Sequence, residues 1–282
     1  MNKIAVVTGG NRGLGLALVR GLCRLLGDDA TVYLTARDAA KGRAAVAELM
    51  AEGLAPKFEQ LDIADTSNIE AFADEMKTRH GGVDILIQNA AYAPKPGRTT
   101  LEEARLTIGT NNHGTAQLLS TFRPLFRAGA RIVVVASGYG TLESLDPRLH
   151  PLFEEVGSAE VEGNLESYLA MLAKGRAQHE GWPEWVNPIT KVGQVALTRA
   201  FARELAADGG VAADIVVNAA CPGWMITDAS RPYLDQLDPS IKPKMPDDAA
   251  GDVIWLATLP AGTTAPYGDL VQYRKVIPFA AS

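Results

Sequence analysis

The chain has 282 residues, 47% of them hydrophobic, and a formal net charge of −6. This negative charge argues against binding to nucleic acid or to an anionic membrane surface. No apolar run approaches the roughly 20 residues of a membrane-spanning helix, and a buried strand is expected from residue 4, where a signal peptide would lie. Cys23 and Cys221 stand apart in apolar surroundings, without the spacing of metal ligands. We therefore expect free thiols, no metal site and a cytoplasmic protein.

Strands and helices are predicted to alternate along the chain. The strands are expected at 4–7, 31–35, 57–62, 83–88, 131–136, 213–218 and 268–273. The helices are expected at 14–22, 39–52, 68–79 (with Thr66 or Ser67 as N-cap), 101–126 (with a break near Gly109), 190–207 and 246–257. This alternation is typical of an α/β fold with a doubly wound parallel sheet of the Rossmann type. We expect residues 1–282 to form a single domain.

One long segment interrupts the alternation. Residues 138–186 lie between the fifth predicted strand and the helix at 190–207, and they are rich in Glu, Leu, Pro and Gly. A helical pattern at 164–180 predicts that this segment is a helical insertion within the domain. A connection of this length between sheet elements usually has a function.

The first predicted strand runs directly into a glycine-rich turn and a helix, which is the opening unit of a dinucleotide-binding fold. Gly9 suits a tight turn, Gly13 allows the backbone to approach a pyrophosphate, and Gly15 allows the helix to lie close to the sheet. The N-terminus of the helix would present free N–H groups to the phosphates. The candidate cofactor ligands in this turn are Gly9, Asn11, Arg12, Gly13, Leu14 and Gly15.

The end of the second predicted strand indicates which dinucleotide binds. An acidic residue there usually binds the ribose 2′-hydroxyl of NAD, but Ala36 occupies this position and Arg37 follows it. Arg37 and Arg12 together would suit a 2′-phosphate. Asp38 could bind a 2′-hydroxyl if the register shifted by two residues. We expect NADP(H) as the cofactor.

The spacing Thr-Gly-x-x-x-Gly-x-Gly, which begins at Thr8, resembles the fingerprint of the short-chain dehydrogenase/reductase family. The resemblance implies further cofactor contacts at later strand ends. Leu61-Asp62-Ile63 resembles the family's adenine-contacting segment, and Gln88-Asn89-Ala90-Ala91 resembles its Asn-Asn-Ala-Gly. Pro222-Gly223 resembles the turn beside the nicotinamide. The contacts implied in this way are Asp62, Ile63, Asn89, Ala90, Lys191, Pro222, Gly223, Trp224 and Thr227.

The match to the family's catalytic residues is incomplete. In the family, a Ser polarises the carbonyl oxygen, a Tyr donates the proton, a Lys four residues later lowers the Tyr pKa and holds the ribose, and an Asn positions a water. The resemblance implies these roles for Ser137, Lys191 and Asn111, but Asn187 occupies the Tyr position. A carboxamide donates hydrogen bonds but cannot release a proton at neutral pH. Loss of a general acid typically lowers a rate by about 10²–10⁴-fold.

A closer resemblance covers essentially the whole chain. Glu180-Gly-Trp-Pro183, Cys221-Pro-Gly-Trp224, the long insertion and Leu259-Pro260 together resemble the monomeric carbonyl reductases within the family. The resemblance implies a monomer, because the insertion would cover the helices that form subunit interfaces in the wider family. Trp182, Trp185 and Trp224 are expected near the mouth of the active site and favour a bulky or polycyclic small-molecule substrate.

Three interpretations of Asn187 remain open. In the first, the protein is an NADPH-dependent reductase of a ketone, enone or iminium, and the proton comes from a water held by Asn111 and Lys191 or from Tyr139. In the second, it is a non-redox NADP(H)-binding protein, either a sensor or a cofactor-templated cyclase or isomerase. In the third, it is an inactivated variant of a carbonyl reductase. We expect the reductase.

Overall fold

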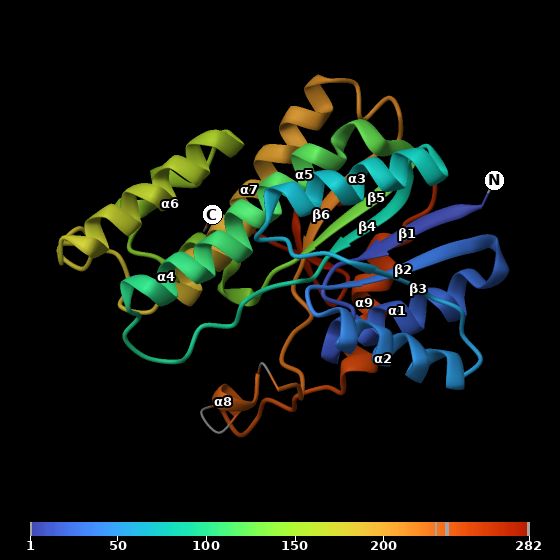
Figure 1. Cartoon of the computed structure of the whole chain (residues 1–282). Helices are drawn as coiled ribbons and strands as arrows, with labels where there is room; N and C mark the ends of the chain where they lie inside the picture. Colours follow the sequence, from blue (N-terminus) through green and yellow to red (C-terminus); the bar gives the residue numbers. More distant parts are fainter. Residues whose placement is uncertain (1, 229, 235–236, 281–282) are drawn as a thin grey trace.

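The computed structural model describes residues 2–228, 230–234 and 237–280 (Figure 1). Within this part of the chain, eight strands form one sheet in the order β3-β2-β1-β4-β5-β6-β7-β8. The strands are β1 (Lys3–Val7), β2 (Ala30–Ala36), β3 (Lys57–Gln60), β4 (Val83–Gln88), β5 (Phe126–Val135), β6 (Val216–Ala220), β7 (Leu270–Gln272) and β8 (Lys275–Ile277). All neighbours are parallel except β7 and β8. The doubly wound α/β fold expected from the sequence is therefore confirmed.

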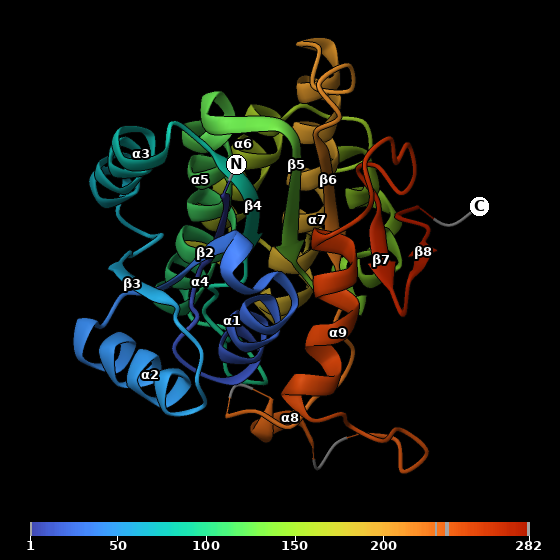
Figure 2. The same ribbon diagram turned by 90° about the vertical axis from the view of Figure 1, so that its right-hand side faces the viewer.

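Helices cover both faces of the sheet (Figures 1 and 2). They are α1 (Gly13–Leu26), α2 (Ala39–Ala51), α3 (Thr66–His80), α4 (Leu101–Ile108), α5 (Gly114–Phe122), α6 (Ser158–Ala173), α7 (Val186–Ala207), α8 (Arg231–Leu234) and α9 (Pro246–Ala257). Successive strand residues face opposite ways, so Val7 packs in the core beneath α1 and α9, and Val6 packs in the core beneath α3 and α5. Among the described helices, none is both long and apolar enough to span a membrane.

Several predicted boundaries were wrong for local reasons. The helix expected at 101–126 is α4, a π-helical turn η2 (Gly109–His113), α5 and a short 3₁₀ turn that contains Pro124, so the break predicted near Gly109 is confirmed. Helix α7 begins four residues earlier than expected because Pro188 lies in its first turn, where its missing N–H would have no partner. Asp65, rather than Thr66 or Ser67, caps α3 and accepts two backbone N–H bonds.

The C-terminal edge of the sheet contains a hairpin that the sequence did not predict. The strand expected at 268–273 is β7, and β8 returns antiparallel to it. Tyr273 and Arg274 form the turn with φ angles of 51° and 62°. Two-residue hairpin turns with positive φ usually contain Asn or Gly, which identifies them in a sequence, and neither residue type occupies this turn. The strand expected at 213–218 is likewise shifted, because β6 covers Val216–Ala220.

Helix α6 is the main element of the segment between β5 and α7, and it packs against α4 and α7 (Figure 1). It covers 158–173 rather than the expected 164–180, because the Glu160 carboxylate accepts the Gly157 N–H at 3.0 Å and fixes an earlier start. Val161, Leu165 and Tyr168 of α6 are buried in the same cluster as residues of α4 and α7. The segment therefore covers one flank of these two helices.

An ion pair joins η2 to α6. The two ring nitrogens of His113 lie 2.9 Å from Glu162 Oε1 and 2.7 Å from Glu166 Oε1. The hydrogen bond with Glu162 is the main reason that the pKa of His113 is raised above its usual value. Protonated His113 is bound more strongly in the folded state, so its stabilisation is fully present below the unfolded pKa of about 6.5 and is lost as pH rises through the folded pKa.

We expect His113→Gln to lower the melting temperature more near about pH 6 than near about pH 9. His179→Gln is a control, since His179 is an exposed residue of the segment between β5 and α7. Melting curves of the three proteins at both pH values test this. An equal effect of His113→Gln at both values would show that the pair contributes nothing through its charge.

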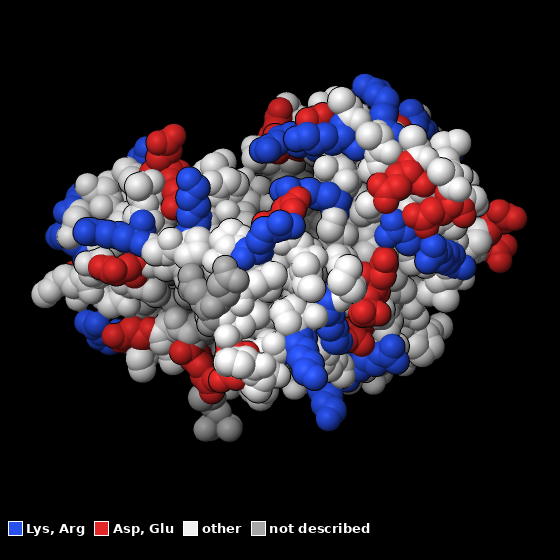
Figure 3. Space-filling model, turned by 90° about the horizontal axis from the view of Figure 1, so that it is seen from below, with Lys and Arg blue, Asp and Glu red and all other residues white. Residues whose placement is uncertain are grey.

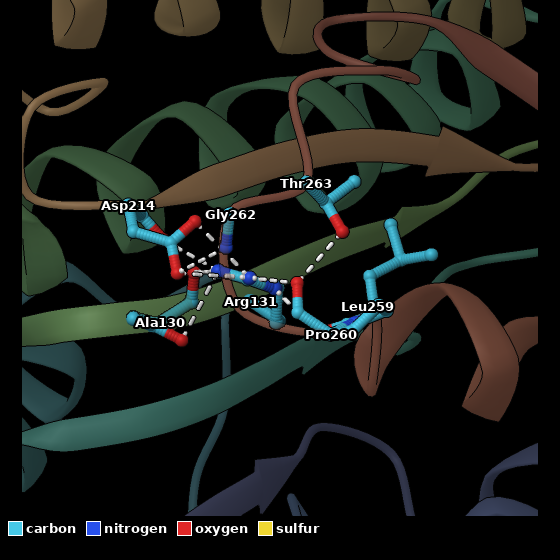
Figure 4. Close-up of polar contacts among 8 residues, drawn as sticks. Ala130, Arg131, Asp214, Leu259, Pro260, Gly262 and Thr263 are labelled. Carbon is cyan, nitrogen blue, oxygen red and sulfur yellow. Dashed lines mark hydrogen bonds and ion pairs between the residues drawn. The ribbon is translucent and has the colours of Figure 1, made fainter.

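Buried Arg131 stabilises the end of the sheet opposite the strands' carboxyl ends (Figure 4). Its side chain is 5% exposed and pairs with the Asp214 carboxylate at 3.2 Å. It also donates hydrogen bonds to the carbonyls of Leu259 at 3.0 Å and Pro260 at 2.7 Å. A buried guanidinium requires partners of this kind, and here they join β5, the approach to β6 and the loop after α9.

Candidate active site

The glycine-rich turn lies between β1 and α1 and can hold a pyrophosphate. Gly9 and Gly13 have φ angles of 64° and 53°, which favour glycine. A Cβ on Gly15 would lie 2.1 Å from the Gly9 carbonyl oxygen, so the helix is seated directly on the turn. Arg12 precedes the helix without a side-chain cap, and the first turn contains no acidic residue. The N–H groups of this turn therefore remain free for an anion.

The turn is held by the strand end beside it. Asn89, after β4, donates from Nδ2 to the carbonyls of Thr8 at 2.9 Å and Gly9 at 3.2 Å. The Thr8 hydroxyl accepts the backbone N–H groups of Asn89 and Ala90, both at 2.9 Å. The sequence motifs predicted Asn89 and Ala90 as site residues. Thr8 was not predicted, although the fingerprint begins with it.

Arg12 and Arg37 lie on two loops that meet. The Gly10 N–H donates to the Thr35 carbonyl at 2.8 Å, which joins the glycine-rich turn to the end of β2. Both arginine side chains are exposed. Among the described residues, Arg12 pairs only with Asp228, at a long 3.7 Å, and both of these side chains are about 70% exposed (69% and 71%). Contacts of this kind are weak and leave the guanidinium available to a ligand.

Asp38 is already used by the fold. Its carboxylate accepts the backbone N–H groups of Ala40 at 3.0 Å and Lys41 at 3.1 Å, and so caps α2. The hydrogen bond from Lys41 is the largest of the causes that lower the pKa of Asp38. Both of these bonds use Oδ1, so the cap occupies only part of the carboxylate, and the preference for a 2′-phosphate rests on the two exposed arginines.

Two further predicted contacts, Asp62 and Ile63, lie in the loop after β3. After β3, the Asp62 carboxylate accepts the Ala64 N–H at 3.0 Å, and the Asp62 N–H donates to Asn68 at 2.7 Å, so this loop is fixed on α3. The Ile63 carbonyl packs against Gly114 at the start of α5, where a Cβ would lie 2.4 Å away. The loop follows the strand end next to β2.

The segment after β6 closes over the glycine-rich turn. It begins at Pro222 and Gly223, and the φ of Gly223 is 77°. The Trp224 carbonyl accepts the Lys244 N–H at 2.9 Å. The Thr227 methyl group lies 3.4 Å from the position of a Cβ on Gly13. The structure therefore brings Thr227 against the turn from the opposite end of the chain.

Ser137 and Cys221 mark the carboxyl ends of neighbouring strands. In Figure 1, β1 runs leftward from the N-terminus, so the strands parallel to it point toward the half of the molecule that holds α4, α6 and α8. Ser137 follows β5 and accepts the Tyr139 N–H at 3.2 Å, which leaves its own O–H free to donate. Burial raises the pKa of the Cys221 thiol, which follows β6.

Lys191 lies in the second turn of α7, beside this strand edge. Burial of the ammonium group lowers the pKa of Lys191 to about 8, and the charge of Cys221 opposes the shift. The Lys191 carbonyl packs against Gly140, three residues after Ser137. The α7 helix is continuous from Val186, so Asn187 and Lys191 lie one turn apart on one helix face.

Asn111 is buried, with 0% exposure, in the π-helical turn η2. Its carboxamide accepts the Tyr92 N–H at 2.7 Å and donates to the Tyr92 carbonyl at 3.0 Å. This pairing uses the side chain to hold the loop after β4. The next residue, Asn112, is bonded to Thr190 of α7, so it joins two helices and does not face a ligand.

Aromatic residues border the N-terminus of α7. The Trp185 ring packs edge-on against Tyr139 at 5.8 Å and lies 5.6 Å from Tyr233. The Tyr233 hydroxyl donates to the Pro94 carbonyl. The expectation that Trp182 lies with them was wrong: it is 3% exposed and packs inside the segment between β5 and α7, 5.0 Å from Tyr168. The described residues contain no group of three or more His, Cys, Asp or Glu side chains that could hold a metal ion.

The fold and this edge define a dinucleotide-binding α/β oxidoreductase. The chain belongs to the short-chain dehydrogenase/reductase family: the family described as short chain dehydrogenase matches residues 3–146. "Carbonyl reductase [NADPH] 1" of Pongo abelii is 39% identical over 279 residues, and that of Homo sapiens is 38% identical over 279 residues; each match covers 97% of both chains. The family match ends before α7, so Asn187 and Lys191 lie outside it.

Solved structures have the same fold. Salutaridine reductase from Papaver somniferum superposes with a TM-score of 0.81 at 24% identity, over 95% of this chain and 99% of that one. A metagenomic short-chain oxidoreductase in complex with NADP superposes with a TM-score of 0.65 at 26% identity, over 96% of this chain and 97% of that one. The fold expected from the sequence is thus shared with members of this family.

Proposed function

We propose that the protein is an NADPH-dependent reductase of carbonyl-type small molecules, namely ketones, enones or iminium ions. The observation that carries the proposal is the juxtaposition, at one edge of the sheet, of an anion-binding glycine turn with Ser137, Lys191 and Asn187. The relatives named "Carbonyl reductase [NADPH] 1" support the same reaction class. The active site differs from the family pattern, because Asn187 stands where the proton-donating Tyr is expected.

NADP(H) is the cofactor. When bound, it supplies the hydride that reduces the substrate. The free N–H groups at the start of α1 bind its pyrophosphate, and Arg12 and Arg37 bind its 2′-phosphate. Asp62, Ile63, Asn89, Ala90 and the segment from Pro222 to Thr227 surround the rest of it.

Ser137 and Asn187 bind the substrate oxygen. The Ser137 oxygen accepts the Tyr139 N–H, and its O–H donates to no group among the described residues, so it can donate to a substrate oxygen. The Asn187 carboxamide donates a second hydrogen bond from the first turn of α7. Neither group releases a proton at neutral pH, so the proton of an alcohol product comes from elsewhere. Iminium ions need no such proton. Trp185, Tyr139 and Tyr233 form an aromatic wall that suits a bulky or polycyclic substrate.

Two measurements on one sample test this function. Fluorescence titrations with NADPH and NADH measure cofactor binding, and a panel of a ketone, an enone and an iminium measures NADPH oxidation. The proposal predicts tight NADPH binding and oxidation with at least one acceptor. Binding without any oxidation would favour a non-redox protein, and a sharp gain of ketone reduction in Asn187→Tyr would favour an inactivated carbonyl reductase.

The protein is proposed to be a monomer that binds neither nucleic acid nor membranes. Helix α6 covers the flank of α4 and α7 that could otherwise pair with a second subunit. Figure 3 shows Lys and Arg side chains interspersed with Asp and Glu over one face of the molecule. Light scattering at micromolar concentration is expected to give the mass of one chain, 30.0 kDa, and a mass near twice this value would contradict the proposal.

The proposed compartment is the cytoplasm, because Cys23 and Cys221 are free thiols.

A further inference from the structure

Lys191 has a partner on its own helix that the catalytic set does not include. Its ammonium Nζ donates a hydrogen bond to Oε1 of Gln194 at 2.7 Å. Gln194 follows Lys191 by three residues, so the two side chains are neighbours on the surface of α7. Asn187 precedes Lys191 by four residues and lies on the same side of the helix. The three polar groups therefore form one row beside the strand edge that holds Ser137.

The burial of Gln194 indicates a role beyond packing. The residue is 0% exposed, and its Nε2 has no hydrogen-bond partner in the part of the chain that the structure describes. A buried amide nitrogen without a partner destabilises a fold, and an apolar residue of similar size would avoid this. The oxygen of the same amide explains why a Gln is present here, because Oε1 accepts the hydrogen bond that orients the Lys191 ammonium.

Few charged groups near Lys191 can stabilise its ammonium, so Oε1 of Gln194 is its main partner. The first turn of α7 contains no acidic residue. Burial raises the pKa of Cys221, the thiol whose charge acts on Lys191, so that thiol is neutral at moderate pH. Other titratable groups lie on described elements that contact α7. They include Tyr139 of η4 (Gly138–Gly140), whose ring packs against Trp185, Glu143 of η5 (Leu142–Ser144), Tyr168 of α6, Glu102, Glu103 and Arg105 of α4, and His113, Glu162 and Glu166, which bind one another.

We propose that Lys191 is the proton donor of the reaction and that Gln194 is the residue that positions it. This inference rests on the proposed reductase function. As the carbonyl carbon accepts the hydride and the C=O π bond breaks, the substrate oxygen takes a proton. One N–H bond of the Lys191 ammonium breaks to supply it, and the neutral amine then takes a proton from solvent. Asn187 contributes a hydrogen bond to the same oxygen and keeps its protons.

The acidity of Lys191 suits this role. A solvent-exposed lysine has a pKa of about 10.4 and is a weak acid near neutral pH. Burial lowers the pKa of Lys191 to about 8, which brings it close to the range where a general acid works best. The hydrogen bond to Gln194 stabilises the charged form and keeps the group protonated at neutral pH.

Titration of Lys191 by NMR tests the role of Gln194 without turnover. The protein carries lysine labelled with ¹³C at Cε, and Lys191→Met identifies the Lys191 resonance. Gln194→Met keeps the length of the side chain but removes the acceptor, so the midpoint is expected about one pH unit lower than in the wild type. Gln194→Glu adds a carboxylate and is expected to raise the midpoint. Melting curves establish that each variant is folded.

The rate of ketone reduction in a single turnover provides the second readout. The ammonium is the active form, so the rate is expected to fall as pH rises through the Lys191 midpoint. In Gln194→Met this fall moves to lower pH, with a rate up to about tenfold lower on the alkaline side, and in Gln194→Glu it moves to higher pH. Reduction of an iminium needs no proton and is expected to keep its pH profile in all three proteins.

The outcomes separate this inference from the proposed function. If the midpoint moves but the fall in rate does not follow it, Lys191 is not the donor. If Tyr139→Phe or Tyr92→Phe removes the alkaline fall, a tyrosine is the donor, and the inference is wrong while the reductase function stands. If neither ketone nor iminium is reduced although NADPH binds, the reductase function itself fails. If the midpoint is the same in all Gln194 variants, the positioning role fails.

Discussion

Replacing Lys191 with Met is expected to lower the rate of ketone reduction in a single turnover by about 10²–10⁴-fold. The variant removes the buried ammonium that binds Gln194 and thereby the proposed proton source. Lys191→Arg is the sharper test, because a guanidinium keeps the positive charge but does not release a proton at any accessible pH. We expect the Arg variant to be about as slow as the Met variant.

The controls separate proton donation from cofactor binding. Lys77→Met changes an exposed lysine on α3, at a distance from the strand edge, and is expected to retain the wild-type rate. NADPH affinity is measured by fluorescence in each variant, and the rate is measured at saturating cofactor. Recovery of the wild-type rate in Lys191→Arg would show that the group acts only through its charge and would refute proton donation.

The double variant Arg12→Ala/Arg37→Ala is expected to lower the preference for NADPH over NADH by about 10²-fold. Each substitution would remove a charge-assisted contact with the 2′-phosphate. A loss of about 1.4 kcal/mol of binding free energy for each contact corresponds to a tenfold loss of affinity. NADH affinity is expected to change little, since that cofactor lacks the phosphate. Fluorescence titrations with both cofactors measure the ratio.

Two controls sharpen this second prediction. Arg176→Ala removes an exposed arginine of the segment between β5 and α7 and is expected to leave the ratio unchanged. Asp38→Ala removes the cap of α2 and is expected to destabilise the protein by about 1 kcal/mol without weakening NADH binding. A marked loss of NADH affinity in Asp38→Ala would instead place the adenosine ribose on that carboxylate.

The fold was predictable because its signals are local and repeated. The β-branched run that ends at Val7, the glycine turn from Gly9 and the alternation of strands and helices each determine a unit of the same α/β architecture. Element boundaries were predicted wrongly where the local sequence departs from the usual helix-start and turn preferences. The helix expected from residue 190 begins at Val186, because Pro188 is accommodated in its first turn, and the turn at Tyr273 and Arg274 has positive φ without Asn or Gly.

The site was predictable in part. Motif spacing identified Asn89 and Thr227, and the structure places both against the glycine turn. Thr8 and Gln194 were not predicted as site residues, because their hydrogen bonds with Asn89, Ala90 and Lys191 are seen only in the structure. A Gln three residues after Lys191 gains meaning only when it is buried and its amide accepts from that ammonium. Trp182 was misplaced for the opposite reason, since an aromatic residue gives no indication of which core it joins.

The most direct test of the central claim, that this chain reduces its substrate without a Tyr at position 187, follows the hydride itself. The wild-type protein is mixed in a single turnover with NADPH deuterated on either face of the transferred position, together with the ketone, the enone and the iminium. Mass spectrometry then locates the label. Deuterium is expected on a carbon of at least one product from one of the two labelled cofactors. Tight binding of NADPH with no label in any product would contradict the claim.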